Sequence, residues 1–536
     1  MDPELIDSLH ADLDAADYRA DSIAALLGAG ADAARQRGVF APALRALAER
    51  GGSPLATLVR LFLLAGRVDR CEFDTAVPAL GVDGALALGL VRSDDADGLQ
   101  AALSLNPVLV ADAGSEEPLH WWIISDLDDQ LRRGPARPDH VMGVGGATRS
   151  LISQAPPGET GRCLDLGTGC GIVAMHLALR GDVVATDISE RALMLARANA
   201  RLGGLEQRIE FRLGDLFEPV SGEHFDLVLS NPPFVITPRG DGDAPVYEYR
   251  DGGMAGDGLA ERVVAEGPAH LAPGGTLLCL ANWESPWGSN GLERVRGWIE
   301  AAADAVGPLD AWVIERDRVD PAQYAETWAR DGGARPGTAE FEGLMDGWLD
   351  DFAARRITAI GLGAIRIRRR PLASSPTGAG TVVEGAVVEG AVVERAVAEG
   401  TVVEIDQAAG AYAGDRLGGG LAAAFDAGVR AARMSDAEVL DTHWLRTESV
   451  VEEREHTPGE EAPRAIRLTT DRPIARRVAA DPLIAAAVGV CDGELSLGRI
   501  ADALATLLEV DPDAAAEALT AGFRELVWLG MLVPAE

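Results

Sequence analysis

A short glycine-rich turn constrains the fold more than any other feature of this sequence. The segment Cys163-Leu-Asp-Leu-Gly-Thr-Gly-Cys-Gly171 runs from an apolar, strand-like stretch directly into a helical pattern that begins at Ile172. Its three glycines let the backbone turn tightly and approach a ligand, with the N-terminus of a helix behind them. Ile172 stands where a dinucleotide site would have its third glycine, so the turn favours another kind of ligand.

The alternation of strand-like and helical segments continues from about Gly134 to Pro371. Strands that alternate with helices form a mainly parallel sheet with helices on both faces. We therefore expect an α/β, Rossmann-like domain of seven strands. The predicted strands are Arg162–Leu166, Val183–Thr186, Ile209–Leu213, Phe225–Ser230, Thr276–Ala281, Trp312–Glu315 and Ile357–Ile367.

Further segments surround this sheet domain, to which we assign residues 134–372. With 536 residues the chain is too long for one ordinary domain. Residues 1–133 and 409–536 contain several helical patterns and short β-like stretches, typical of winged-helix-like modules, with a plain helical cap as an equal alternative for the first. Residues 373–408 include a Val-Val-Glu repeat of period five (381–404), which matches neither helix nor strand, so we expect a surface insertion there.

The charge of the chain limits the partners that it can bind through its overall field. It contains 84 Asp and Glu against 48 basic residues, all of them Arg, which gives a formal net charge of −36. Such a field disfavours coating of nucleic acid or of an anionic membrane. The five cysteines form no CxxC pair, no apolar run could span a membrane, and the N-terminus is acidic. We expect a cytoplasmic protein without disulfides, zinc or a signal peptide.

Three carboxylates accompany successive predicted strands. Asp165 lies in the strand before the glycine turn, Asp187 ends the next strand, and Asp215 follows the third. Because the carboxyl ends of parallel strands meet at one edge of a sheet, these groups are expected to lie close together. An acid at a strand end is often only a helix cap, but three in register favour a ligand that carries amine and hydroxyl groups.

The segment Asn231-Pro-Pro-Phe234 follows directly on the strand Phe225–Ser230. Its two prolines fix the backbone as it leaves the sheet and remove amide donors. The Asn231 side chain and the Pro232 carbonyl can then accept hydrogen bonds from a flat NH₂ group, which stacks on the ring of Phe234. Such a nitrogen is a poor nucleophile, so in-line placement and hydrogen bonds that raise its electron density would supply the catalysis.

These motifs resemble the HemK-type class of S-adenosylmethionine (SAM)-dependent N-methyltransferases. The DxGxGxG spacing is similar to motif I of SAM methyltransferases, and the resemblance covers about residues 134–372. It implies a class I methyltransferase fold, SAM as cofactor, and a planar amide or amine nitrogen as acceptor. This family methylates the glutamine amide of peptide-chain release factors, and the NPPF/Y motif is shared with enzymes that methylate exocyclic amines of adenine or guanine.

The resemblance also assigns roles to residues. It implies that Asp187 holds the ribose, that Asp215 and Leu216 hold the adenine, and that the segment 140–147 packs beside the cofactor. The family usually has Tyr at the position of Phe234, so this chain would keep the stacking and lose a hydroxyl. The implied cofactor-binding residues are Asp165, Gly167, Thr168, Gly169, Gly171, Asp187, Ile188, Asp215, Leu216 and Asn231. The implied catalytic residues are Asn231, Pro232, Pro233 and Phe234.

The substrate stays open between two classes. A protein glutamine, as in release factors, fits the resemblance and the acidic composition best. An exocyclic base amine in ribosomal or transfer RNA is the alternative, because winged-helix-like modules commonly bind nucleic acid. A catalytically silent SAM-binding scaffold is disfavoured by the intact motif at 231–234.

Three weaker features complete the sequence predictions. The segment Tyr247–Gly253 is expected to face the substrate. His120-Trp-Trp122 offers a stacking platform or, more often for Trp beside aliphatic residues, a part of the core. The arginines at 366–370 could contact RNA phosphates, but alternating arginines on an edge strand are the interpretation that we favour.

Overall fold

The computed structural model forms two compact units, which we describe separately. Unit 1 comprises Met1–Ile152, Gly158–Val263 and Pro321–Arg356, and unit 2 comprises Ser153–Pro157, Val264–Asp320 and Ile357–Glu536. The structure describes residues 1–50, 52–94, 98–110, 118–128, 131–132, 137–239, 252–371, 383–388, 391–398, 400–408 and 410–535.

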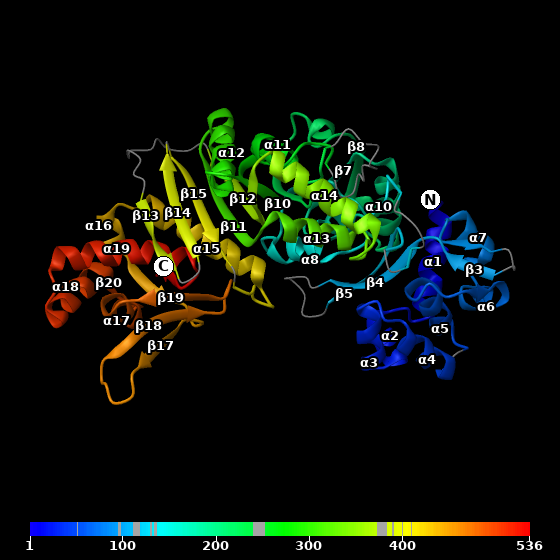
Figure 1. The fold of residues 1–536 in the computed structure, drawn as a ribbon, viewed down its shortest axis with the longest axis horizontal. Coiled ribbons are helices and arrows are strands. Elements are labelled where there is room, and N and C mark those ends of the chain that lie inside the picture. The colour runs from blue at the N-terminus through cyan, green and yellow to red at the C-terminus, as the bar shows by residue number, and fades with distance from the viewer. Residues whose placement is uncertain are drawn as a thin grey trace. The chain divides into compact units, whose positions relative to one another are not determined.

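Unit 1 contains the four strands that carry the sequence motifs (Figure 1). Strands β6 (Arg162–Leu166), β7 (Asp182–Asp187), β8 (Ile209–Leu213) and β9 (Phe225–Ser230) pair in parallel in the order β9-β6-β7-β8. Helices α9 (Ile172–Leu177) and α10 (Glu190–Leu202) follow β6 and β7. The sequence predicted these strands to within one residue, because their apolar runs are buried as parallel strands require.

The first hundred residues of unit 1 are mainly helical. Ser53 caps α5, where its hydroxyl accepts a hydrogen bond from the Ala56 amide at 3.2 Å and Pro54 occupies the first turn. A small antiparallel sheet follows in the order β1-β3-β2. The elements are α1 (Pro3–Ala15), α2 (Ala20–Leu27), α3 (Ala29–Gln36), α4 (Ala41–Arg50), α5 (Pro54–Leu58), a π-helical turn (Val59–Leu63), β1 (Val68–Asp69), α6 (Arg70–Ala76), α7 (Gly81–Ala87), β2 (Val91–Ser93) and β3 (Gly98–Ala101).

A hairpin of β4 (Ser104–Val110) and β5 (Leu119–Ser125) leads from this helical region toward the parallel sheet of unit 1. Trp121 and Trp122 on β5 are buried, and the Trp122 indole donates a hydrogen bond to the Tyr18 carbonyl at 2.6 Å. These two tryptophans are therefore part of the core rather than a stacking platform. Unit 1 also contains α13 (Pro321–Asp331) and α14 (Ala339–Ala354), which pack on one another.

Unit 2 contains the other three predicted strands, each longer than predicted. Strand β12 (Ile357–Arg369) pairs antiparallel with both β10 (Leu271–Pro286) and β11 (Leu309–Val319). Helix α12 (Gly291–Val306) connects β10 to β11 along the chain, and Asn290 caps it. Helices α8 (Gly146–Gln154) and α11 (Gly258–Glu266) contain residues of both units.

The Val-Val-Glu repeat forms strands, which differs from the surface insertion that we expected. Strands β13 (Val383–Val388), β14 (Ala391–Ala398) and β15 (Thr401–Gln407) form an antiparallel ladder, and β15 pairs in parallel with β11. Val402 and Val403 on β15 are fully buried. Valine favours strands, and β11 supplies a backbone edge that only the tertiary structure creates.

The arginines at 366–370 do not lie on an edge strand, because β12 has a partner on each side. Arg366 is buried and donates a hydrogen bond to the Gln154 carbonyl at 2.8 Å, and burial lowers its pKa to about 10. Arg369 and Arg370 donate to the carbonyls of Leu271 and Gly400. These guanidinium groups make contacts within unit 2, which contradicts the edge-strand interpretation and disfavours a role in RNA binding.

The remainder of unit 2 is helical with two small sheets, in the orders β20-β16-β21 and β17-β18-β19. Asp511 caps α19, with its side chain accepting from the Ala514 amide at 3.0 Å. No helix within the described ranges is long and apolar enough to cross a membrane. The elements are α15 (Leu417–Arg433), α16 (Asp436–Asp441), β16 (His443–Arg446), β17 (Val451–His456), β18 (Pro463–Thr470), β19 (Arg476–Ala480), α17 (Pro482–Gly489), β20 (Asp492–Ser496), α18 (Leu497–Leu508), α19 (Pro512–Trp528) and β21 (Leu532–Pro534).

Candidate active site

A cavity of about 570 Å³ opens in unit 1 where β6, β7 and β9 end. Of the residues implied as cofactor-binding or catalytic, all but Gly171 line this cavity. The predicted residues on its wall are Asp165, Gly167, Thr168, Gly169, Asp187, Ile188, Asp215, Leu216, Asn231, Pro232, Pro233 and Phe234. The fold thus brings together four motifs that are far apart in the sequence.

The glycine turn after β6 forms one wall of the cavity. Gly167 and Gly169 have φ angles of +77° and +54°, and a Cβ atom added at either would meet no atom within 4 Å. Gly171 has a different role, because a Cβ there would lie 2.9 Å from the Cβ of Ala196. Two of the glycines therefore leave space for a ligand, and the third permits the close packing of α9 on α10.

Asp165 is buried beneath this turn, at 1% exposure. Its Oδ2 atom accepts hydrogen bonds from the Thr168 hydroxyl at 2.6 Å and from the Ala174 amide at 2.9 Å. Burial raises the pKa of the Asp165 carboxyl to about 7, against the lowering effect of these two hydrogen bonds. The group therefore titrates near neutral pH in the absence of a cationic ligand.

This raised pKa predicts a pH-dependent stability. Between about pH 4 and pH 7 the Asp165 carboxyl is protonated in the native state but ionised in the unfolded chain. Its contribution to the free energy of unfolding is therefore largest below about pH 4 and is lost as the pH rises through about 7. In the Asp165→Asn variant this side chain is neutral at every pH. As the pH increases from about 4 to about 7, the unfolding free energy of the variant is therefore expected to rise relative to that of the wild type. Urea unfolding at several pH values, without SAM, measures this difference. If the unfolding free energies of the two proteins changed with pH in the same way, the prediction would be contradicted. The control is Asp182→Asn, a change at an exposed aspartate.

Asp187 stands at the end of β7, on the cavity wall. One carboxylate oxygen accepts a hydrogen bond from the Gly169 amide and the other from the Ser189 amide, each at 2.9 Å. The carboxylate thus ties the glycine turn to the start of α10. Ile188 beside it is 62% exposed, so an apolar side chain also faces the open cavity.

The loop after β8 brings Asp215 and Leu216 to the cavity. Asp215 pairs with Arg262 of α11, whose Nη1 donates to Oδ2 at 3.0 Å, a partner that sequence reasoning missed. Leu216 has a φ of +42°, a left-handed conformation that non-glycine residues rarely adopt. Strained backbone of this kind concentrates at functional sites.

Asn231 presents an unpaired oxygen at the cavity. Its Nδ2 donates a hydrogen bond to the Thr148 hydroxyl of α8 at 3.1 Å. Its Oδ1 is buried and has no hydrogen-bond partner in the described part of the chain, and the residue lines the cavity. A buried acceptor without a partner costs stability unless a ligand supplies the donor. The Asn231 side chain is therefore oriented to accept a hydrogen bond from a ligand N–H or O–H.

Helix α13 supplies a wall that the sequence did not predict. Trp328 and Asp331 line the cavity, and the Trp328 ring packs edge-on against Phe234 with ring centroids 6.3 Å apart. The next turn of backbone is anchored by hydrogen bonds from the Ile236 amide to the Tyr324 hydroxyl and from the Trp348 indole to the Ile236 carbonyl, at 2.9 and 2.8 Å. No local signal in 321–354 marks these residues, because a helical pattern alone does not say where the helix packs.

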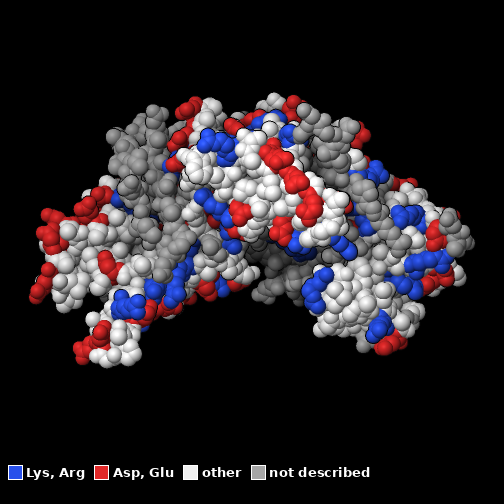
Figure 2. Space-filling model, in the orientation of Figure 1, with Lys and Arg blue, Asp and Glu red and all other residues white. Residues whose placement is uncertain are grey.

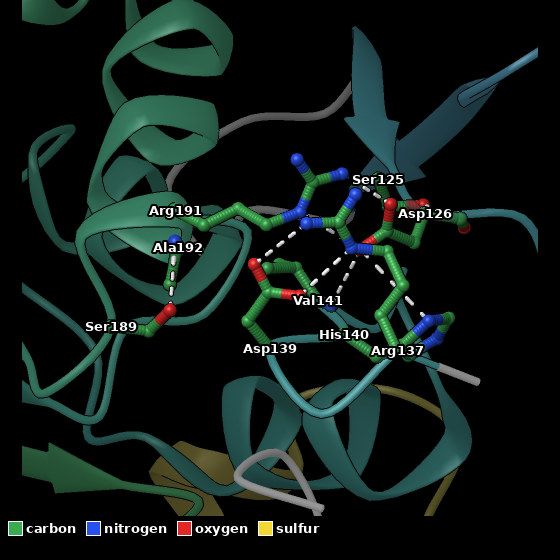
Figure 3. Close-up of polar contacts among 9 residues, drawn as sticks. All are labelled: Ser125, Asp126, Arg137, Asp139, His140, Val141, Ser189, Arg191 and Ala192. Atoms are coloured by element: carbon green, nitrogen blue, oxygen red, sulfur yellow. Dashed lines mark hydrogen bonds and ion pairs between the residues drawn. The ribbon is translucent and has the colours of Figure 1, made fainter.

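Residues of the segment 140–148 also line the cavity, and a carboxylate holds this segment in place. Figure 3 shows Asp126, which follows β5, between Val141 and Arg191 of α10. Asp126 accepts from the Val141 amide at 2.9 Å and from Arg191 Nε at 3.3 Å, while its own amide donates to the Val141 carbonyl at 3.0 Å. Asp126 is buried and His140 lies 3.9 Å from it. The hairpin β4–β5 thus positions this part of the cavity wall.

One predicted feature lies largely outside the described residues, namely the segment Tyr247–Gly253, of which only Gly252 and Gly253 are described. Both of these glycines line the cavity.

Comparison with known proteins agrees with this site. A methyltransferase small domain matches residues 142–305, and a domain of unknown function, DUF7059, matches residues 15–102. A solved structure of a methyltransferase from Pyrococcus furiosus is 15% identical in sequence to this chain, with a TM-score of 0.23. The match covers 41% of this chain and 80% of the Pyrococcus chain.

Curated relatives give the family. The release factor glutamine methyltransferase of Cereibacter sphaeroides is 41% identical over 33% of this chain and 64% of its own length. The ribosomal protein uL3 glutamine methyltransferase of Bradyrhizobium diazoefficiens is 35% identical over 26% of this chain and 46% of its own. This chain thus spans less than two thirds of these two relatives. The release factor glutamine methyltransferase of Bordetella pertussis is 33% identical to this chain. That match covers 37% of this chain and 73% of the Bordetella protein. This chain belongs to the HemK-type family of SAM-dependent methyltransferases.

Proposed function

We propose that this protein transfers a methyl group from SAM to the side-chain amide of a glutamine in a protein of the translation apparatus. The observation that carries the proposal is the unpaired, buried Oδ1 of Asn231 on a proline-fixed turn beside a cavity of about 570 Å³. The names of the relatives, which are release factor and ribosomal protein uL3 glutamine methyltransferases, support this class of substrate.

The cavity residues fit SAM. Its size suits a ligand of nucleoside dimensions, and Gly167 and Gly169 leave a cradle that side chains would fill. The Asp187 carboxylate, fixed by the Gly169 and Ser189 amides on the cavity wall, is a hydrogen-bond acceptor suited to ribose hydroxyls. The apolar side chains of Ile188 and Leu216 on the wall suit the faces of the adenine ring. When bound, SAM supplies an electrophilic methyl group on a sulfonium.

Asn231 and its neighbours would hold the acceptor nitrogen. The Oδ1 atom accepts one amide N–H, while the hydrogen bond to Thr148 fixes the rotation of the side chain. Accepting a hydrogen bond from the NH₂ group raises the electron density on nitrogen, and the rigid turn at Pro232 and Pro233 would hold that nitrogen in line with the methyl. The nitrogen becomes a strong acid once methylated and releases a proton to water, so no strong base is required before transfer.

The charge beside the cavity favours a protein over RNA. Figure 2 shows acidic side chains gathered over α14, the helix that packs on α13. Its exposed residues include Glu340, Glu342, Asp346 and Asp350. Carboxylates in this position would repel the phosphates of an RNA substrate. We propose cytoplasmic release factors or a ribosomal protein as partners, selected by segments outside 134–372.

Labelled SAM tests the proposal. The purified protein is incubated with bacterial release factors, with ribosomal protein uL3, and with ribosomal and transfer RNA. We expect label on a protein, stable to ribonuclease, sensitive to protease, and located on glutamine by mass spectrometry. Label on RNA that ribonuclease removes would overturn the protein substrate in favour of a base amine, and no transfer to any acceptor would overturn both.

A further inference from the structure

The acceptor end of the cavity contains a second unpaired polar atom besides that of Asn231. The Nε1 atom of Trp328 is buried and has no hydrogen-bond acceptor within the described ranges. A buried indole N–H usually finds a hydrogen-bond acceptor. Trp348, on the neighbouring helix, is an example, because its indole donates to the Ile236 carbonyl at 2.8 Å. A buried donor without a partner is costly, and Trp328, unlike the equally unpaired Trp312 and Trp528, lines the cavity, where a ligand can supply the acceptor.

The position of this indole is well defined. Its ring lies edge-on to Phe234 at 6.3 Å between centroids and tilted against Tyr324 at 5.9 Å. Tyr324 in turn accepts the Ile236 amide, so α13 is bound to the same turn that carries Asn231 and Phe234. Trp328 therefore keeps a fixed relation to the proposed acceptor site rather than moving as an isolated surface side chain.

A carboxamide has hydrogen-bonding needs of two kinds. Its NH₂ group donates, and its carbonyl oxygen accepts. Among the described residues that line the cavity, Asn231 carries an unpaired buried acceptor, Oδ1, and Trp328 carries an unpaired buried donor, Nε1. The acceptor alone disfavours an amide bound with its oxygen and nitrogen exchanged, because two oxygens would then face one another. A donor for the carbonyl oxygen adds a second hydrogen bond that only the productive orientation can make.

We propose that Trp328 is a specificity-determining residue whose indole N–H binds the carbonyl oxygen of the acceptor carboxamide. This inference rests on the proposed function, because it presumes an amide acceptor. Helix α13 lies between β11 and β12 and outside the residues that match the methyltransferase small domain, 142–305.

The test is Trp328→Phe, which keeps an aromatic ring beside Phe234 and removes the N–H. Methyl transfer to a purified bacterial release factor is measured at saturating SAM, with active protein counted by calorimetric SAM binding. We expect kcat/KM to fall about ten-fold or more, through a higher KM and a lower kcat, with the Kd for SAM unchanged. The matched control is Trp312→Phe, since the Trp312 indole is also buried and unpaired but lies outside the cavity. Its kcat/KM is expected to stay at the wild-type value.

The outcomes separate this inference from the proposed function. Wild-type transfer to glutamine together with an unchanged kcat/KM in Trp328→Phe would overturn the role of Trp328 alone. Equal losses in Trp328→Phe and Trp312→Phe, or a weaker affinity for SAM in Trp328→Phe, would overturn it in favour of a structural role. A wild type that methylates no protein glutamine would overturn the proposed function and this inference with it.

Discussion

Asn231→Ala is expected to lower methyl transfer about 100- to 1,000-fold while SAM still binds. The substitution removes the unpaired Oδ1 that we propose to accept a hydrogen bond from the acceptor NH₂ group. Initial rates with labelled SAM measure the loss, and calorimetry measures the affinity for SAM. Because the cofactor would be held mainly by the glycine turn and Asp187, its affinity should change far less than the rate.

Two further variants make this result specific. Thr148→Val removes only the partner of Asn231 Nδ2, so it loosens the side chain and is expected to cost less activity than Asn231→Ala. Asn106→Ala changes an asparagine on β4 outside the cavity and should behave as the wild type. Full activity in Asn231→Ala would show that the acceptor binds elsewhere.

Asp187→Ala is expected to raise the Kd for SAM about 10- to 100-fold, because a charged acceptor of hydrogen bonds is lost. The carboxylate would bind the ribose, and it also holds the amides of Gly169 and Ser189, so the glycine turn loses its anchor as well. Isothermal titration calorimetry with SAM measures the change. Asp182→Ala is the matched control, since Asp182 is an exposed residue at the opposite end of the same strand. An unchanged Kd in Asp187→Ala would remove this residue from the cofactor site.

Local patterns predicted the parallel strands well, because a buried strand is a short apolar run and needs little information from elsewhere. The cavity residues of the glycine turn and of 231–234 were predictable for a related reason. Each motif directly follows a strand, and the carboxyl ends of parallel strands meet at one edge whatever the details of packing.

Other parts of the site depend on segments that meet only in space. The unpaired indole of Trp328, the Arg262 partner of Asp215, and the Asp126 anchor of the wall at 140–148 carry no motif. Their helices and loops would look the same in sequence if they packed elsewhere. Gly171 does not line the cavity, and its positive φ and missing Cβ allow close packing against Ala196, a contact that no local signal in the sequence indicates.

By itself, the sequence determined the strands of the parallel sheet, the chemistry at their ends, and the family to which the motifs belong. Only the tertiary structure decided that the Val-Val-Glu repeat extends a sheet, that β12 is an interior strand, and that α13 lines the cavity. The physical reason is the distance along the chain between the residues that determine each feature. Turn geometry and strand burial follow from neighbouring residues, whereas an unpaired polar atom acquires its meaning from what packs around it.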